Sequence, residues 1–227
     1  MREVILDTET TGLDPRTGDR IIEIACIELL NHLPTGRVWQ AYVNPEREVS
    51  VAALDVHGIT DSFLKDKPVF SEIVADFLEF IGDAPLVIHN ADFDIGFLNA
   101  ELGRLGFPPL PASRGKDTVA LARRKFPGSP ASLDALCKRF NIDNSARTKH
   151  GALLDAELLA DVYLELVGGR QAGLELAGAR STIAIGISGA PAPGVAVRPP
   201  RPHAPSAAEL VAHEALLKDI SDPIWRR

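Results

Sequence analysis

Two features that would place a protein outside the cell or in a membrane are missing from this sequence of 227 residues. It contains only two cysteines, Cys26 and Cys137, whose separation matches neither a disulfide framework nor a metal-binding pair. No window reaches 18 consecutive apolar residues, and the first ten residues include acidic side chains instead of a long apolar run. These absences argue against a secreted scaffold and a membrane span, and we expect a cytoplasmic protein.

Positive charge is also scarce. The chain has 24 lysine and arginine residues against 31 aspartate and glutamate residues, which gives a net charge of −7. Autonomous nucleic-acid-binding proteins usually carry a basic surface, because phosphate contacts dominate their affinity. An acidic chain that acts on nucleic acid therefore needs another source of positive charge, or a tether that holds it near its substrate.

The sequence does contain enough apolar material for one core, since 45% of its residues are hydrophobic. Apolar runs predict strands over 3–6, 21–30, 38–43 and 85–89. Helical spacing and capping signals predict helices over 71–81, 118–125 and 151–167. A further helix follows the strand at 85–89 and ends at 105, and another is capped by Ser132 and ends at 140. Three strands followed by alternating helices and strands favour a mixed α/β sheet with helices on both faces.

The composition changes after Gly169. Residues 177–205 are rich in Gly, Ala, Pro and Ser, which predicts a flexible linker and not a second domain. Residues 207–219 have the pattern of a short helix, and an aromatic-basic tail follows it. We therefore expect four parts, namely a folded domain (1–170), a short peptide (171–176), a linker (177–205) and a C-terminal segment (206–227).

The strongest chemical signal is the pair Asp7 and Glu9, directly after the first apolar run. Alternate residues of a strand point to the same face, so the two carboxylates project together. Adjacent carboxylates repel each other unless they are protonated or neutralised by a cation, and Mg²⁺ and Mn²⁺ prefer oxygen ligands. The pair alone is also compatible with a solvated strand end.

Three further residues strengthen the metal-site interpretation. Asp94 follows the strand expected at 85–89, near the start of the next helix. Asp155 lies within the apolar 151–167 helix, where an unpaired charge would be costly unless it faces solvent. His150 stands just before that helix, where a general base would be useful, although a histidine there is commonly a cap or a surface residue.

Three segments together carry a family resemblance: LDTETTG at 6–12, HNADFDIGFLN at 89–99 and HGALLDAELLADVYL at 150–164. In order and spacing they resemble the three motifs of the DEDD exonuclease superfamily, histidine subclass. Within that superfamily the chain looks most like the epsilon proofreading subunits of bacterial DNA polymerase III. The resemblance covers 1–170, and it implies a ribonuclease H-like mixed sheet flanked by helices and followed by a flexible C-terminal tail.

The resemblance also implies residue roles. Four carboxylates would bind metal, namely Asp7, Glu9, Asp94 and Asp155. His150 would take a proton from the attacking water, while two Mg²⁺ or Mn²⁺ ions neutralise the scissile phosphate and a 5′-mononucleotide leaves. The family's Phe-Asp pair maps to Phe93 and Asp94, so Asp94 is the expected ligand and Asp92 is expected to be exposed.

Contacts to the terminal nucleotide are expected from Thr10, Gly12 and His57. The segment that contains Thr10 and Gly12 follows the carboxylate pair directly, so its backbone can meet the sugar and base. His57 is assigned by the resemblance, and the alternative is a loop histidine that holds its own turn. Phe93 and Phe97 lie at helical spacing, and we expect them to pack in the core rather than to stack on bases.

The remaining expectations concern protein partners. The QAGLEL segment at 171–176 resembles peptides that dock on the bacterial sliding clamp, unless it only fills the helix exit. Its contacts would be Gln171, Leu174 and Leu176. Segment 206–227 resembles the part of epsilon that binds the polymerase III alpha subunit, with Leu217 and Trp225 as anchors. Some members of the family also bind a small accessory subunit, and no membrane partner is expected.

Two rival interpretations share parts of this pattern. A free-standing RNA-trimming exonuclease of the same superfamily would have the same catalytic groups but no need for the tail. A bridging replisome subunit with the same fold and no activity would not need all five catalytic positions, which are filled here. We therefore expect a metal-dependent 3′→5′ DNA exonuclease that proofreads for a replicative polymerase.

Overall fold

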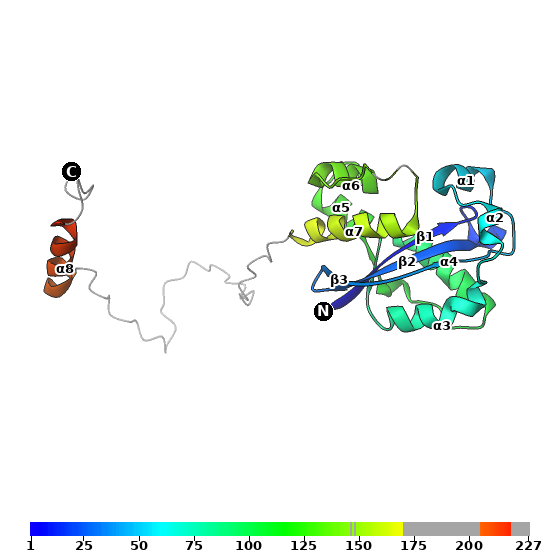
Figure 1. Ribbon diagram of the computed structural model, residues 1–227, viewed down its shortest axis with the longest axis horizontal. Helices are drawn as coiled ribbons and strands as arrows, with labels where there is room; N and C mark the ends of the chain where they lie inside the picture. Colours follow the sequence, from blue (N-terminus) through cyan, green and yellow to red (C-terminus); the bar gives the residue numbers. More distant parts are fainter. Residues whose placement is uncertain (146, 148, 170–204, 219–227) are drawn as a thin grey trace, which may run out of the picture. The chain divides into compact units, whose positions relative to one another are not determined.

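The computed structural model describes residues 1–145, 147, 149–169 and 205–218 (Figure 1). The chain divides into two compact units, Met1–Glu175 and Leu176–Arg227. The strands are β1 (Arg2–Thr10), β2 (Ile21–Leu30), β3 (Leu33–Tyr42), β4 (Leu86–Ile88) and β5 (Gly115–Asp117). The helices are α1 (Val51–His57), α2 (Asp61–Leu64), α3 (Phe70–Ile81), α4 (Ala91–Arg104), α5 (Thr118–Lys125), α6 (Leu133–Phe140), α7 (Ala152–Val167) and α8 (Ala207–Lys218), with 3₁₀ turns at Pro15–Thr17 and Ala112–Arg114. Within these ranges, none of the helices combines the length and hydropathy that a membrane crossing requires.

A five-stranded mixed sheet forms the centre of the first unit, in the order β3-β2-β1-β4-β5. β1 pairs antiparallel with β2, and β2 pairs antiparallel with β3. β4 runs parallel to both β1 and β5. The turn between β2 and β3 contains Asn31 and His32, both with positive φ, as tight hairpin turns require. The predicted mixed sheet is confirmed, and β1 is its central strand.

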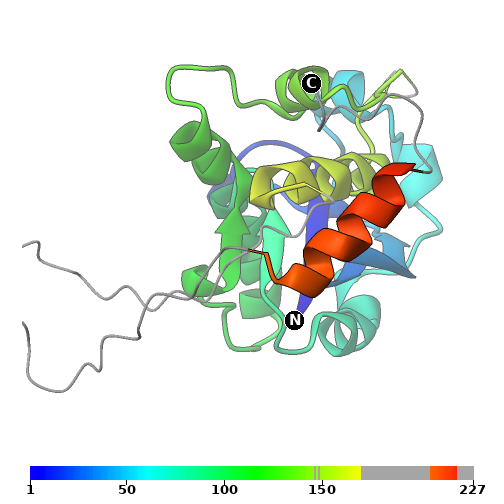
Figure 2. The same ribbon diagram turned by 90° about the vertical axis from the view of Figure 1, so that its left-hand side faces the viewer.

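Helices cover both faces of this sheet (Figure 1, Figure 2). α3 and α4 pack on one face, around Phe77 and Leu98. α5, α6 and α7 pack on the other face. Along β1, Val4 and Leu6 belong to the first core and Ile5 belongs to the second, as the two-residue period of a strand requires. Because both faces are covered, β1 and β2 are apolar along most of their length.

Several boundaries differ from the sequence prediction. β1 extends to Thr10, because its pairing with β2 continues through both acidic residues of the strand. β3 begins at Leu33 and not at residue 38. The prediction missed its first residues because they are exposed and carry no apolar pattern. α1, α2 and β5 were not predicted, because seven, four and three residues are too few to reveal a period. The other predicted strands and helices of the first unit are confirmed to within one or two residues at each end.

The described part of the second unit contains α8, where the sequence predicted a helix. Ser206 and Glu209 cap its start reciprocally, because the hydroxyl of Ser206 accepts from the amide of Glu209 and the carboxylate of Glu209 accepts from the amide of Ser206. Leu217 is 5% exposed, whereas the neighbouring Leu216 is 58% exposed. The expected clamp peptide at 171–176, with Gln171, Leu174 and Leu176, lies outside the described residues, as do most of the expected linker and Trp225.

Candidate active site

A pocket of about 480 Å³ opens at the carboxyl end of β1. Side chains from β1, α4, α7 and the segment before α7 line it, among them Asp7, Glu9, Asp94, His150 and Asp155. The carboxyl ends of the parallel strands β1 and β4 meet at this edge of the sheet, which is where open α/β sheets place their ligands. The fold therefore brings together the five residues that the motifs predicted to act together.

The alternating directions of the side chains along β1 explain how β1, α4 and α7 all contribute residues to the pocket. Asp7 and Glu9 share the face of Ile5, which is covered by α7. Thr8 points to the opposite face, and its hydroxyl donates to a carboxylate oxygen of Asp94 on α4 at 2.7 Å. Asp94 is 3% exposed, so this bond holds a nearly buried carboxylate at the end of the central strand.

The carboxylates of the pocket are costly to ionise together. Burial, followed by the charges of neighbouring carboxylates, raises the pKa of Asp7 well above its usual value. The same causes raise the pKa of Glu9 to about 8, and burial raises that of Asp94 to about 7. Such a cluster is stabilised as anions only when positive charge is supplied.

A divalent cation fits this set of donors. One ligand atom each from Glu9, His150 and Asp155 lies within 4.8 Å of the other two. Asp7 and Asp94 add carboxylate oxygens in the same pocket. Oxygen-rich sites of this kind are the sites that Mg²⁺ and Mn²⁺ prefer, and the four carboxylates of the pocket supply oxygen ligands without the His150 nitrogen.

Arg147 is a pocket residue that the motifs did not reveal. Its guanidinium forms two hydrogen bonds to Asp155, from Nε at 2.6 Å and from Nη2 at 2.7 Å, and it also pairs with Asp134 at 2.8 Å. Nδ1 of His150 lies 2.8 Å from the Arg147 guanidinium and 3.1 Å from Asp155. Arg147 therefore supplies positive charge to Asp155. The sequence signal that could have identified Arg147 is its place three residues before His150.

Glu23 is a second residue that the motif analysis missed. It lies directly opposite Glu9 in the β1–β2 pairing and is 2% exposed. Its carboxylate accepts hydrogen bonds from Gln40 at 2.7 Å and from the amide of Ala152, at the start of α7, at 3.1 Å. Glu23 therefore anchors the helix that carries Asp155 to the central sheet. A charged residue within the apolar strand at 21–30 was the signal that could have identified it.

Comparison with known proteins agrees with this geometry. A family model described as exonuclease (RNase_T) matches residues 4–163. The DNA polymerase III subunit epsilon of Rickettsia felis is 57% identical over 179 residues, which are 78% of each chain. The subunit of the same name from Escherichia coli K12 is 48% identical over 177 residues, which are 74% of this chain and 72% of that one. The chain belongs to the epsilon-subunit family of exonucleases.

Solved structures place the fold in the same group. Exonuclease X in complex with 5′-overhanging duplex DNA is 28% identical, with a TM-score of 0.57, and the match covers 72% of this chain and 90% of that one. Escherichia coli exonuclease I in complex with a dT13 oligonucleotide has a TM-score of 0.65 at 20% identity, over 75% of this chain and 41% of that one. The second likeness is one of fold alone. Both agree with the ribonuclease H-like sheet that the motifs implied.

The expected nucleotide-contacting residues of this epsilon-family chain lie beside the pocket, not in its lining. Thr10 is 6% exposed, and its hydroxyl donates to the carbonyl of Gly12 at 2.6 Å. His57 is the last residue of α1 and is 6% exposed. Its Nδ1 accepts from the amide of Ile59 at 2.9 Å, so it does hold its own turn. Its Nε2 is buried and has no hydrogen-bond partner within the described part of the chain.

The side chains at the start of α4 divide into buried and exposed ones, as the helical period requires. Phe97 is 1% exposed and belongs to the core, as predicted. Phe93 packs partly against that core and also lines the pocket, which the sequence did not predict. Asp92 is exposed, as predicted. Leu13, directly after Gly12, is 85% exposed and lines the pocket, so the chain reaches the site one residue beyond the Thr10–Gly12 segment.

Proposed function

We propose that this protein removes nucleotides one at a time from the 3′ end of a DNA strand, as the proofreading exonuclease of a bacterial replicative polymerase. The observation that carries this proposal is the convergence of Asp7, Glu9, Asp94, His150 and Asp155 in one pocket. Four carboxylates and one histidine are the groups that metal-assisted hydrolysis of a phosphodiester needs. The names of the relatives, DNA polymerase III subunit epsilon, support the replicative context.

Asp7, Glu9, Asp94 and Asp155 would hold two divalent cations, either Mg²⁺ or Mn²⁺. When bound, the cations would neutralise the charge of the scissile phosphate and favour ionisation of the attacking water. The raised pKa values of Asp7, Glu9 and Asp94 support this role, because the folded chain gains stability when these groups meet a cation.

His150 would act as the general base. Nδ1 faces both the Arg147 guanidinium, which can only donate, and Asp155, which accepts. With Arg147 turned away, Nδ1–H would donate to Asp155, and Nε2 would carry the free lone pair that accepts a proton from water. His150 is half-exposed at the mouth of the pocket, and its backbone amide donates to the carbonyl of Val56 in α1 at 3.2 Å. This backbone contact positions the histidine while its ring stays accessible to substrate.

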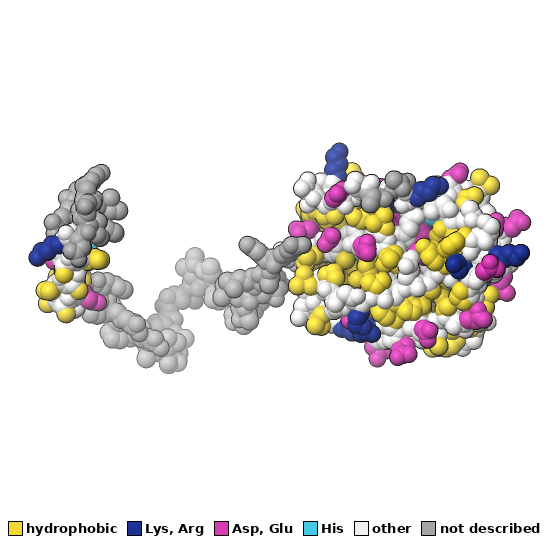
Figure 3. Space-filling model, in the orientation of Figure 1, with side chains coloured by type: hydrophobic (Ala, Val, Ile, Leu, Met, Phe, Trp, Pro, Cys, Tyr) yellow, Lys and Arg dark blue, Asp and Glu magenta, His cyan; other side chains and the backbone are white. Residues whose placement is uncertain are grey.

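The surface outside the pocket supports a tethered enzyme. On the face seen in Figure 3, the described lysine and arginine side chains are scattered and do not form one basic patch. With a net charge of −7, the protein would bind DNA weakly and with strong dependence on salt. A tether raises the effective substrate concentration, and therefore replaces intrinsic affinity.

We assign the tethers to the C-terminal region. Segment 206–227 would bind the polymerase III alpha subunit, with Trp225 as an anchor, and segment 171–176 would bind the sliding clamp. The test is co-purification of the alpha subunit and of the clamp with the full chain and with its Trp225→Ala and Gln171→Ala variants. Each variant should lose one partner and keep the other. Retention of both partners by both variants would contradict the assignment.

Strand direction and substrate are tested with end-labelled oligonucleotides. A 3′-labelled single-stranded DNA should release labelled 5′-mononucleotide at the earliest times, and a 5′-labelled copy should shorten gradually. Both reactions should need Mg²⁺ or Mn²⁺ and should stop with EDTA. Faster degradation of the matching RNA would favour the RNA-trimming alternative. No activity on either polymer would favour the non-catalytic bridging subunit.

The chain supplies a matched pair of variants for this assay. Asp94 and Asp92 lie in the first turn of α4, the former buried in the pocket and the latter exposed. Asp94→Ala should abolish nucleotide release, and Asp92→Ala should retain it. The opposite result would move the metal-ligand role to Asp92 and contradict the site proposed here.

A further inference from the structure

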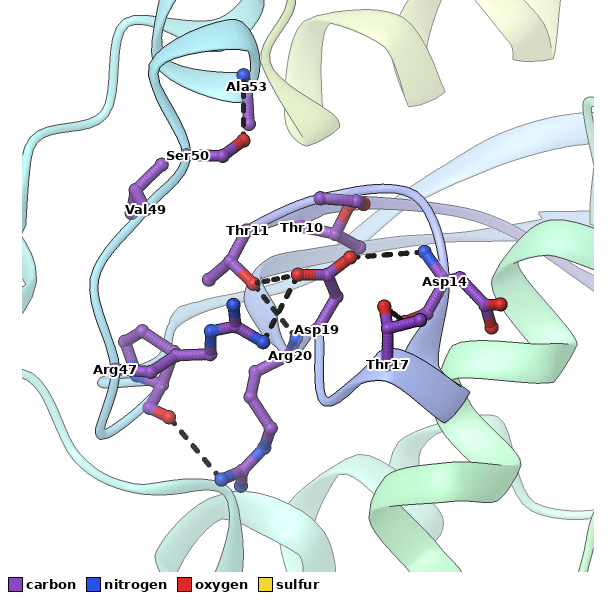
Figure 4. Close-up of polar contacts among 12 residues, drawn as sticks. Thr10, Thr11, Asp14, Thr17, Asp19, Arg20, Arg47, Val49, Ser50 and Ala53 are labelled. Atoms are coloured by element: carbon purple, nitrogen blue, oxygen red, sulfur yellow. Dashed lines mark hydrogen bonds and ion pairs between the residues drawn. The ribbon is translucent and has the colours of Figure 1, made fainter.

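We infer that Asp19 is a positioning residue for the substrate, because it holds the Thr10–Asp14 segment in the shape that meets the terminal nucleotide. This inference rests on the proposed function. Asp19 follows the Pro15–Thr17 turn and lies outside the sequence motifs. Its side chain is 14% exposed, and it is directed toward the backbone of the segment that follows the carboxylate pair (Figure 4).

Three donors from two segments converge on the Asp19 carboxylate. Oδ1 accepts from the hydroxyl of Thr11 at 3.2 Å, and it forms an ion pair with Arg47 at 3.1 Å. Oδ2 accepts from the backbone amide of Asp14 at 3.1 Å. The carboxylate therefore fixes the segment at both ends, one residue before Gly12 and two residues after it. An aspartate suits this position because both of its oxygens accept hydrogen bonds.

Gly12 is packed against the same carboxylate. A methyl group at Gly12 would lie 2.5 Å from Cγ of Asp19, closer than real contacts allow. The segment therefore passes Asp19 with no room for a side chain at this point. Since Leu13 is the next residue and lines the pocket, a shift of the segment away from Asp19 would move a pocket-lining side chain.

The contact of this segment with α1 does not use Asp19. The carbonyl of Thr11 accepts from the amide of Ser50, which caps the start of α1, and the carbonyl of Val56 in the same helix accepts from the amide of His150. These are backbone bonds that a change of the Asp19 side chain leaves in place. We therefore expect an Asp19 variant to weaken substrate binding and to leave the proton transfer at His150 nearly unchanged.

Glu28 provides a matched control. Its side chain is 10% exposed, pairs with Arg2 and Arg37, and accepts from the hydroxyl of Thr35, so it shares the arginine and hydroxyl contacts of Asp19. It lies near the other end of β2, opposite Val4, and does not line the pocket. Asp19→Asn and Glu28→Gln both replace one acceptor oxygen by a donor, so they disturb local bonding to a similar extent.

The first test compares these two variants in the full-length protein. Asp19→Asn should raise KM for single-stranded DNA about tenfold while kcat changes less than about twofold, because binding is lost equally in the ground state and in the transition state. Its affinity for thymidine 5′-monophosphate with Mg²⁺, measured by calorimetry, should fall by about the same factor. Glu28→Gln should leave both quantities unchanged. Equal kinetic constants for the two variants would overturn the inference.

The second test uses the packing of Gly12 on Asp19. Gly12→Ala alone should raise KM about tenfold or more, because the new methyl group displaces the segment. In an Asp19→Ala background the carboxylate is gone, so adding Gly12→Ala should raise KM by less than about twofold more. An equal effect of Gly12→Ala in both backgrounds would mean that this glycine acts on the nucleotide directly, and would overturn the inference.

The failure of this inference is distinguishable from the failure of the proposed function. If the parent protein degrades DNA from its 3′ end and the Asp19 variants keep its KM, only the positioning role is wrong. If the parent protein releases no nucleotide from DNA or RNA, the proposed function is wrong and the positioning role is wrong with it. Thermal midpoints of all variants, measured with the same samples, identify any that fail to fold.

Discussion

In the absence of divalent cations, the free energy of unfolding of this protein should fall as the pH rises. Burial, together with the charges of Asp155, Glu23 and Asp94, raises the pKa of Glu9 from 4.5 to about 8. A carboxyl group with a higher pKa in the folded protein holds its proton more tightly there than in the unfolded chain. Its contribution to stability is fully present below about pH 4.5, and it is lost as the pH rises through about 8.

The size of the effect follows from the same values. One pKa unit corresponds to about 1.4 kcal/mol, so the raised pKa of Glu9 sets an upper limit of about 5 kcal/mol on the free energy of unfolding lost. Glu9 is partly exposed, and screening by solvent reduces this loss to about 2 kcal/mol. For a domain of this size, that loss lowers the thermal midpoint by about 4–8 °C.

The assay is calorimetric unfolding in EDTA from about pH 5.5 to about pH 8.5, on the parent protein, Glu9→Gln and Glu79→Gln. Glu79 is an exposed carboxylate on α3 and serves as the control. The midpoint of Glu9→Gln should fall less with pH than that of the parent, and Glu79→Gln should behave like the parent. Mg²⁺ or Mn²⁺ should stabilise the parent most at the higher pH. A Glu9→Gln protein whose midpoint falls as steeply as the parent's would refute the reasoning.

Three further changes give defined outcomes. His150→Gln should lower kcat by about 10²–10⁴-fold with metal affinity unchanged by calorimetry, and a lost metal affinity would reassign His150 as a ligand. Arg147→Gln should tighten Mn²⁺ binding, because the cation no longer competes with the guanidinium for Asp155, and weaker binding would contradict this competition. Glu101→Ala should lower the free energy of unfolding by about 3 kcal/mol in urea titrations, since it removes a buried carboxylate that accepts two hydrogen bonds from Arg20, and a loss below about 1 kcal/mol would disagree.

Much of the site was predictable because its residues lie in local patterns. Asp7 and Glu9 are two residues apart, so any strand through them places both carboxylates on one face. The helix predicted over 151–167 was long enough to show its period, and it is α7 in the structure. His150, just before this helix, could be placed beside Asp155 from chain geometry alone. Short elements such as α1 and β5 left no such pattern.

The sequence by itself therefore determined the mixed α/β fold class, the exonuclease family and the set of acidic residues, because each depends on residue type and short-range spacing. Only the tertiary structure decided which charges meet. Arg147 pairs with Asp155, Glu23 lies opposite Glu9, and Asp19 supports the segment around Gly12. Each of these contacts depends on how chain segments pack against one another, and packing sets distances that no sequence period encodes.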